Sequence, residues 1–146
     1  MDMIEKLIVN HLEETINTKN YLLNNLKLRK KIVKIIKVVS KSISSKGKIL
    51  TCGNGGSSSD AQHMTAEFMV RLNKNFIRGP IPSITLGVES PTITAHTNDF
   101  EFTSLFSRGV EAFGHKNDSL IVFSTSGKSK NIIEVLKIAK KMKLKT

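Results

Sequence analysis

The stretch TCGNGGSSSDAQHMTAEF, residues 51–68, combines glycines, hydroxyls, an imidazole and carboxylates in a mixture that no hydrophobic core requires. Glycine lets backbone N–H groups approach a ligand without an intervening Cβ atom, and serine hydroxyls add donors. A second stretch, STSGKS at residues 124–129, repeats this mixture after another apolar run. Each is predicted to follow a strand and to open a helix, where unpaired N–H groups and the helix dipole favour an anion. These features indicate two turns that together hold a phosphate monoester.

An alternative reading assigns the same residues a structural role. In that reading the glycines form a tight turn, and the polar side chains at residues 57, 60, 126 and 129 only cap helices. Either turn alone leaves this alternative open. Two such turns at equivalent places favour a ligand site, because in a parallel sheet both would lie at the carboxyl edge, where ligands bind. Neither turn has the spacing of a Walker A loop or of a dinucleotide-binding fingerprint.

His63 and Glu67 are four residues apart, so they project from the same face of the predicted helix, one turn beyond GNGG. One alternative is a surface ion pair, because a catalytic zinc usually takes three protein ligands and this pair supplies two. Beside a phosphate cradle, however, a metal on the pair could polarise a sugar carbonyl. A carboxylate could then remove the proton from the neighbouring carbon.

The elements that must position these groups follow from the apolar spacing. Two amphipathic helices come first, and then strands alternate with helices, which argues for a parallel sheet covered on both faces. We therefore predict an α/β fold: a three-layer α/β/α sandwich with a parallel sheet, preceded by two N-terminal helices. The whole chain, 1–146, is predicted to be one domain, with the helical pair in 1–46 and the α/β core in 47–146. Helices are predicted over residues 4–16, 26–44, 57–72, 91–97, 101–113 and 131–142, and strands over 48–52, 83–86 and 120–123.

Composition limits the classes of protein that this chain can belong to. The 39% of hydrophobic residues and 24% of charged residues favour a folded protein. No apolar run is long enough for a membrane span, and no signal peptide is predicted. The single cysteine, Cys52, cannot form an internal disulfide, which suits a cytoplasmic protein.

The net charge of +11 is unevenly placed, with ten basic and no acidic residues from Lys19 to Lys48. A nucleic-acid surface is one interpretation of this run. Scarce aromatic residues and the absence of a nucleic-acid motif instead favour a solvated helix face. We therefore expect neither a nucleic-acid nor a membrane partner.

Three blocks in order along the chain resemble the phosphoheptose isomerases, a branch of the sugar isomerase (SIS) domain superfamily: GNGGSSSDAQHMTAEFMVRL, ITAHTNDFEFTSLFSRGVEA and STSGKSKNIIEVLKIAKK. The resemblance implies isomerisation of D-sedoheptulose 7-phosphate to D-glycero-D-manno-heptose 7-phosphate by an enediol mechanism. This reaction belongs to the synthesis of lipopolysaccharide heptose. The resemblance also implies zinc-bound homotetramers, with active sites between subunits.

The same resemblance implies roles for individual residues. Glu67 would be the catalytic base, would contact substrate and, with His63, would bind Zn²⁺. Arg71 would orient Glu67 and line the substrate site. The phosphate and the sugar hydroxyls would be bound by the remaining matched positions: Asn54, Gly55, Gly56, Ser57, Asn98, Asp99, Ser124, Thr125, Ser126 and Ser129.

The family's pattern continues beyond Lys145–Thr146, so the core is expected to be C-terminally truncated. The family's glutamine and histidine that complete the metal site have no match in these residues, and the remaining zinc ligands are expected in a missing C-terminal segment. Two other functions stay open on these grounds. One is a non-catalytic SIS-domain protein that associates with a replication initiator. The other is a sugar-phosphate sensor.

Overall fold

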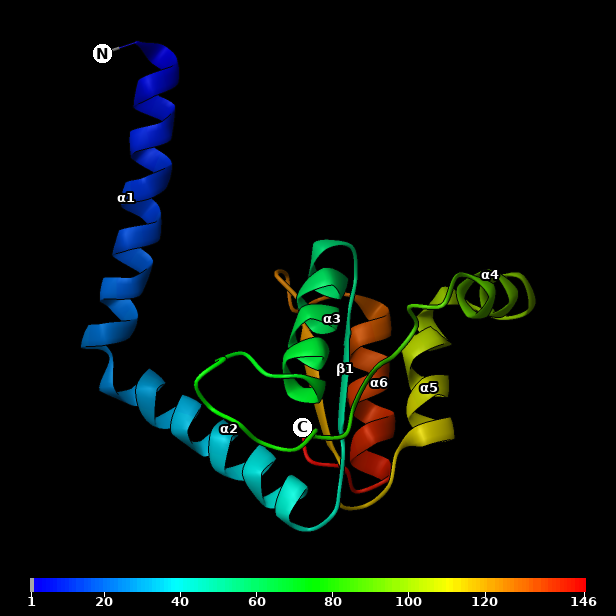
Figure 1. Ribbon diagram of the computed structural model, residues 1–146. Coiled ribbons are helices and arrows are strands. Elements are labelled where there is room, and N and C mark those ends of the chain that lie inside the picture. Colours follow the sequence, from blue (N-terminus) through cyan, green and yellow to red (C-terminus); the bar gives the residue numbers. More distant parts are fainter. Residues whose placement is uncertain (1) are drawn as a thin grey trace. The chain divides into compact units, whose positions relative to one another are not determined.

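The structure of this protein is a computed structural model that describes residues 2–146 (Figure 1). The chain divides into two compact units, the first ending at Lys37 and the second running from Val38 to Thr146. The prediction that all of it forms one domain stays a prediction. No helix in the described part of the chain is both long enough and apolar enough to cross a bilayer.

The first unit contains α1 (Met3–Asn24) and most of α2 (Leu26–Ser44), the two helices predicted from apolar spacing. The Asn25 side chain starts α2 by accepting a hydrogen bond from the backbone N–H of Leu28 at 3.0 Å. Helix α1 buries none of its residues, and its apolar stripe remains exposed within this chain.

The second unit is built on three parallel strands, β1 (Ile49–Gly53), β2 (Ser83–Thr85) and β3 (Ser119–Phe123), in the order β2-β1-β3. Ile49 lies opposite Ser83 on one side and opposite Ser119 on the other. Lys145 adds an isolated parallel bridge to Ser119 beyond β3. The parallel sheet confirms the predicted architecture.

Helices cover both faces of this sheet (Figure 1). Helix α3 (Gly56–Met69) lies on one face, and α5 (Leu105–Phe113) and α6 (Lys130–Lys141) cover the other. Helix α4 (Ser90–Asp99) follows β2, and the helix predicted over 101–113 begins as a 3₁₀ turn at Phe102–Ser104. The three-layer α/β/α sandwich is therefore confirmed.

The two faces of β1 differ because side chains alternate along a strand. Leu50 and Cys52 point into an apolar core shared with α5 and α6, which includes Phe106, Val110 and Val135. This face supplies most of the burial, and the hydrophobic effect favours it in proportion to the apolar area removed from water.

The opposite face carries a buried network of hydroxyls under α3. The Thr51 hydroxyl oxygen lies 3.2 Å from the Ala61 carbonyl oxygen, 3.1 Å from the Thr85 hydroxyl and 3.0 Å from the Thr65 hydroxyl, all within hydrogen-bond distance. Met69, the last residue of α3, and Leu72, which follows the helix, are 53% and 79% exposed. Helix α3 is thus attached to the sheet through hydroxyls and a small alanine, and not through its large apolar side chains.

The amino end of the β1–β3 pair is closed by a buried ion pair. The Lys48 ammonium lies 2.6 Å from Asp118, whose side chain is 3% exposed. Backbone N–H groups of Lys48 and His115 also donate to this carboxylate, at 2.8 and 2.7 Å. Desolvation would raise the pKa of Asp118, but the hydrogen bonds from Lys48 and His115 and the Lys48 charge outweigh it and lower the pKa below its ordinary value of 3.8.

Candidate functional site

The β1–α3 turn holds the first glycine-rich motif at the carboxyl end of β1. A Cβ atom at Gly53 would lie 2.4 Å from the Ser57 carbonyl oxygen, so the strand can meet the first turn of α3 this closely only with glycine. Gly55 has φ +56°, and a Cβ atom at Gly55 or Gly56 would meet nothing within 4 Å. The turn is therefore compact on its sheet side and open on its outer side, as a backbone cradle for a ligand requires.

The β3–α6 turn holds the second motif at the neighbouring position. The Ser124 hydroxyl oxygen accepts from the Gly127 N–H at 3.0 Å, and the Ser126 hydroxyl oxygen accepts from the Lys128 N–H at 3.1 Å. Gly127 has φ +63° with open space around it. Both hydroxyls shape the loop as acceptors, which leaves their O–H hydrogens available to donate to an anion.

The capping alternative does not account for these polar residues. The N-cap positions of α3 and α6 are Gly55 and Ser129, and neither makes a side-chain capping bond. Ser57 and Asp60 lie inside α3 and not at its cap. At α3 the N–H groups of Ser57 and Ser58 already donate to the Asn54 and Gly55 carbonyls, at 3.0 and 2.9 Å. At α6 the first helical N–H with a backbone acceptor is that of Ile133, which donates to the Ser129 carbonyl at 3.0 Å, so the start of α6 presents donors at the positive end of a dipole.

A pair of side-chain amides joins the two turns. The Asn54 amide donates to the Asn131 side-chain oxygen at 3.0 Å, and the Asn131 amide donates back to the Asn54 oxygen at 2.8 Å. Asn131 is only 3% exposed. The two turns therefore lie side by side, as the sequence predicted, and the residue that joins them was not predicted. An asparagine in the first turn of a helix gives no signal of a partner 77 residues away.

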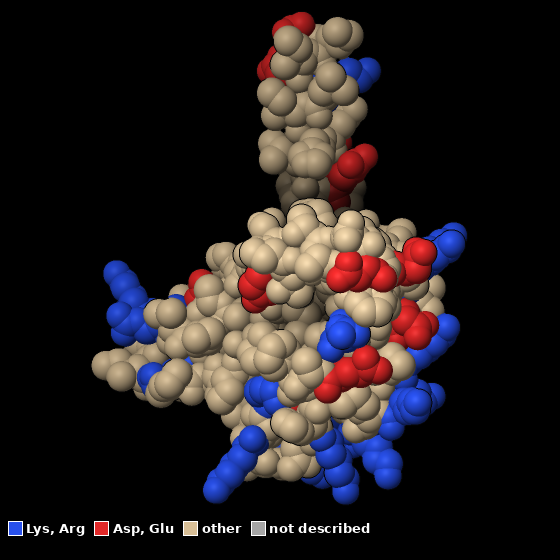
Figure 2. All heavy atoms as spheres, turned by 90° about the vertical axis from the view of Figure 1, so that its right-hand side faces the viewer, with Lys and Arg blue, Asp and Glu red and all other residues tan. Residues whose placement is uncertain are grey.

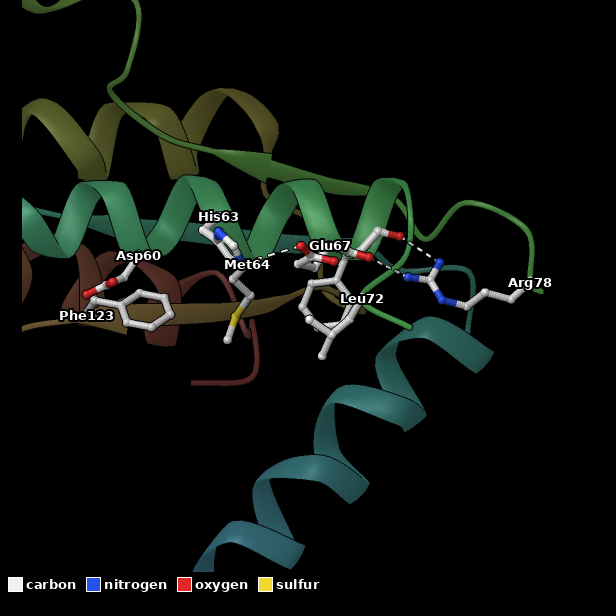
Figure 3. Close-up of a pocket in the computed structure, with 8 residues that line it drawn as sticks. Asp60, His63, Met64, Glu67, Leu72, Arg78 and Phe123 are labelled. Atoms are coloured by element: carbon white, nitrogen blue, oxygen red, sulfur yellow. Dashed lines mark hydrogen bonds and ion pairs between the residues drawn. The ribbon is translucent and has the colours of Figure 1, made fainter. Parts of the chain in front are cut away.

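His63 and Glu67 project from the same face of α3 into a pocket of about 440 Å³ (Figure 3). The His63 Nε2 atom lies 3.4 Å from a Glu67 carboxylate oxygen, and their side chains are 73% and 30% exposed. Asp60 and Phe123 line the end of the pocket that leads to the two turns, because Phe123 directly precedes Ser124. The pocket thus brings an imidazole and a carboxylate next to the predicted anion site.

A different arginine from the expected one approaches this pocket. Arg78 lines it and donates to the carbonyls of Glu67 and Phe68 at 2.6 and 2.8 Å, at the end of α3 (Figure 3). A cation there bonds the last carbonyls of the helix and complements its dipole. Arg71, expected to orient Glu67, instead donates to the Lys74 carbonyl at 3.3 Å, and the structure does not bring it to the Glu67 carboxylate.

Asn98 and Asp99 lie outside this pocket. They end α4, where the Asn98 amide donates to the Asp99 carboxylate at 2.8 Å, and they line a separate surface hollow with Glu101 and Glu134. Within this chain the structure does not bring them together with His63 and Glu67. Their predicted role at substrate stays a prediction.

The donors around His63 and Glu67 suit part of a metal site. Residues 2–146 contain no cluster of three or more histidine, cysteine or acidic side chains placed to hold a metal ion. The imidazole and carboxylate are ligand types that zinc prefers, and they fit as two of its four ligands. Cys52 does not contribute, because it is buried and its burial raises the pKa of the thiol to about 12.

The excess positive charge is not spread evenly. Figure 2 shows lysine and arginine side chains gathered at the lower end of the face that it displays, with acidic side chains above them. Helix α6 carries two of its four lysines, Lys140 and Lys141, in its last turn, where a positive charge complements the helix dipole. Lys128 and Lys130 flank the start of α6, so positive charge is present beside the second turn as well.

Comparison with known proteins gives a consistent result. Residues 16–146 match the family model described as SIS domain. The phosphoheptose isomerase of Chlorobaculum parvum is 41% identical over 109 residues, which are 75% of this chain and 52% of the relative. That of Thermodesulfovibrio yellowstonii is 38% identical over 144 residues, 98% of this chain and 69% of the relative. The chain thus spans from about half to about two thirds of the length of these relatives.

A solved structure agrees with these sequence matches. The phosphoheptose isomerase of Neisseria gonorrhoeae superposes with a TM-score of 0.87 at 32% identity. The match covers 97% of this chain and 72% of the gonococcal chain. The similarity therefore extends over almost all of the described elements.

Proposed function

Because this chain belongs to the SIS domain family, and within it to the phosphoheptose isomerases, we propose that it takes part in the isomerisation of D-sedoheptulose 7-phosphate to D-glycero-D-manno-heptose 7-phosphate. The reaction is an aldose–ketose isomerisation in the synthesis of lipopolysaccharide heptose. The observation that carries the proposal is the joined pair of anion-binding turns beside His63 and Glu67. In this arrangement the two turns bind the phosphate of the substrate, and His63 and Glu67 face its carbonyl end.

The phosphate binds at the carboxyl edge of the sheet. The first N–H groups of α6 surround it with donors, together with the hydroxyls of Ser57, Ser124, Thr125, Ser126 and Ser129. Gly55 and Gly56 let the sugar chain leave this cradle toward the pocket, because no side chain fills the space beside them. A phosphate held there fixes the far end of the substrate.

Glu67 acts on the other end. Its carboxylate removes one proton from C1 of the ketose, the carbon beside the C2 carbonyl, and the C2 oxygen is protonated to give the enediol. Return of a proton to C2, with loss of a hydroxyl proton from O1, then gives the aldose, so no atom or electron is gained or lost. The 30% exposure of Glu67 lets the substrate reach this carboxylate.

The proposed metal is Zn²⁺, held in part by the His63 imidazole and the Glu67 carboxylate. Bound there, it would supply polarisation of the sugar oxygens next to the proton that moves. The other ligands would come from groups beyond residues 2–146 of this chain. His63 is well placed for ligation, because its ring is 73% exposed and its Nε2 atom already faces Glu67.

We further propose that the working protein is a homotetramer in the cytoplasm. The exposed apolar stripe of α1 supports assembly, since such a stripe is stable in water only when another surface covers part of it. Asn98 and Asp99 would then contact sugar hydroxyls at a site shared between subunits. Their distance from the His63 pocket within one chain fits that arrangement.

An assay on the heptulose phosphate tests the proposal. We expect purified protein with Zn²⁺ to convert it to the aldose, and Glu67→Gln to lower the rate about 10²- to 10⁴-fold, the usual effect of a general base. Glu111→Gln, at an exposed position of α5, is the matched control and keeps the rate of the unmodified protein. Equal turnover by Glu67→Gln would remove Glu67 as the base. The protein assayed must include the groups that supply the remaining zinc ligands, and no turnover by that unmodified protein would overturn the proposed activity.

A further inference from the structure

The reciprocal amide pair between Asn54 and Asn131 is the only side-chain hydrogen bonding seen between the two turns within the described residues. From it we infer that Asn131 is a positioning residue, which holds the β1–α3 and β3–α6 turns at the separation that a single phosphate needs. The inference rests on the proposed function and deepens it. Asn131 acts through Asn54, and touching the ligand is no part of its role.

The geometry makes this pair specific. Asn54 directly follows β1 and lies one position beyond the Gly53–Phe123 pairing, while Asn131 lies in the first turn of α6. Each amide uses one N–H and one oxygen lone pair on the other, at 3.0 and 2.8 Å. Two parallel bonds fix both distance and orientation, which one bond cannot do.

Burial gives the pair its strength. Asn131 is 3% exposed and Asn54 is half-buried, so water cannot readily replace either bond. A buried amide that loses its partner carries the full cost of desolvation. The two turns therefore separate only against that cost, even though each is open and glycine-containing on its outer side.

The pair also changes what Asn54 offers to a ligand. Resemblance to the family placed Asn54 at the sugar, yet here its amide is committed to Asn131. One N–H hydrogen of that amide remains, together with the backbone donors of the turn. Its main contribution is thus to keep the adjoining Gly55 and Gly56 in place beside the start of α6.

The choice of amides over charged groups suits an anion site. An aspartate at either position would place a negative charge beside the phosphate. A lysine has only donors, so it would leave the amide N–H of its partner without an acceptor. Two asparagines form two bonds with no net charge. The pair can hold the turns without altering the field that the helix starts present to the ligand.

Phosphate affinity in a double-mutant cycle tests the inference, with inorganic phosphate as the probe and calorimetry as the measurement. We expect Asn131→Leu, which keeps the size of the side chain and removes both bonds, to raise the Kd for phosphate about tenfold. We expect Asn54→Leu to do the same or more. In the double variant the second substitution should add less than about a twofold change, because the shared bond is already lost.

A matched control separates positioning from general loss of stability. Asn117 also bonds across the fold, to the Ser45 carbonyl at 3.3 Å, but at the amino edge. Asn117→Ala should leave the Kd unchanged while Asn131→Leu raises it. If Asn131→Leu does not fold, Asn131→Ala with side-chain amide hydrogen exchange on Asn54 replaces it, and faster exchange is expected.

The outcomes separate this inference from the proposed function. Additive effects of the two substitutions on the Kd, or an unchanged Kd in Asn131→Leu, would overturn the positioning role. A chain that binds phosphate and shows the predicted coupling but does not isomerise the heptulose phosphate would overturn the function alone. A chain that does not bind phosphate at all would overturn both.

Discussion

At one end of the β1–β3 pair, Lys48 and Asp118 form a buried ion pair; at the other end, Asn54 and Asn131 form a buried pair of neutral amides. Lys48 and Asp118 directly precede the paired strands β1 and β3, whereas Asn54 directly follows β1 and Asn131 lies in the first turn of α6, the helix after β3. At the amino end every bond of the carboxylate goes to the protein. At the carboxyl end the amides leave open glycines and free hydroxyl hydrogens beside them.

The difference teaches how one sheet separates stability from binding. A charged pair is acceptable at the amino end, because the buried carboxylate of Asp118 accepts several hydrogen bonds from the protein there. The same pair at the carboxyl end would have put a fixed charge into an anion site. Neutral amides join the chain there without that interference.

Among the substitutions that test this comparison, Asp118→Asn is expected to change the free energy of unfolding most. It leaves the Lys48 ammonium without its counter-charge, and we expect the free energy of unfolding to fall by about 3 kcal/mol in urea titrations. The Kd for phosphate should not change, since the substitution lies at the opposite end of the strands. Glu134→Gln, which removes the exposed pair with Lys137, is the matched control and should cost less than about 1 kcal/mol. A large change in phosphate affinity would break the comparison.

Acid should remove part of the same stability. Because the folded pKa of Asp118 is below the ordinary value of 3.8, the unfolded chain binds a proton there more readily than the folded one. The stabilisation is complete well above pH 3.8 and is lost as the pH falls through the lower folded pKa. We expect the unfolding free energy of the unmodified protein to fall more steeply below about pH 4 than that of Asp118→Asn. Parallel pH curves for the two would contradict the assignment.

Gly127→Ala tests the open end with a smaller effect. The φ of +63° disfavours a residue with a Cβ atom, while nothing lies within 4 Å of where that atom would be. We expect a loss of about 1 kcal/mol from backbone strain alone, together with weaker phosphate binding. Gly56→Ala is the control, because its surroundings are equally open and no positive φ is recorded there. It should leave stability unchanged or raise it slightly in thermal unfolding.

Ser129→Ala gives the smallest expected change in stability and sharpens the comparison most directly. Replacing a serine that caps its helix by alanine lowers the free energy of unfolding by about 1 kcal/mol. Ser129 makes no capping bond, so we expect a change within about 0.5 kcal/mol. Phosphate binding should weaken, because a hydroxyl donor is lost. A stability loss of the capping size with unchanged binding would restore the purely structural interpretation of this turn.

The sequence alone predicts most of this fold, because its signals are local. Apolar periodicity locates each helix and strand within a few residues, and the glycine and serine turns follow two of those strands. The layer packing of α3 was not foreseen. Ala61 and Thr65 face the sheet in place of the large apolar residues of α3, because their partner Thr51 on β1 is itself polar.

The site was predictable to the same extent, as residue types at short spacings. His63 and Glu67 share a face because they are one helical turn apart, and the structure places them in one pocket. Partners distant in the sequence were not predictable. No local sequence pattern around Asn131 or Arg78 indicates its hydrogen-bond partner. The bonds from Asn131 to Asn54 and from Arg78 to the Glu67 carbonyl both depend on how the chain folds back on itself.

The hydroxyls beneath α3 have a consequence for the two side chains on its outer surface. An interface made of apolar side chains lets a helix shift or rotate slightly, because the hydrophobic effect is non-directional. Thr51, Thr65 and Thr85 impose a discrete register instead, because a small rotation would misalign several bonds together. The direction in which His63 and Glu67 project from α3 is therefore fixed by hydrogen bonds between threonines on the opposite side of the helix, where it meets the sheet.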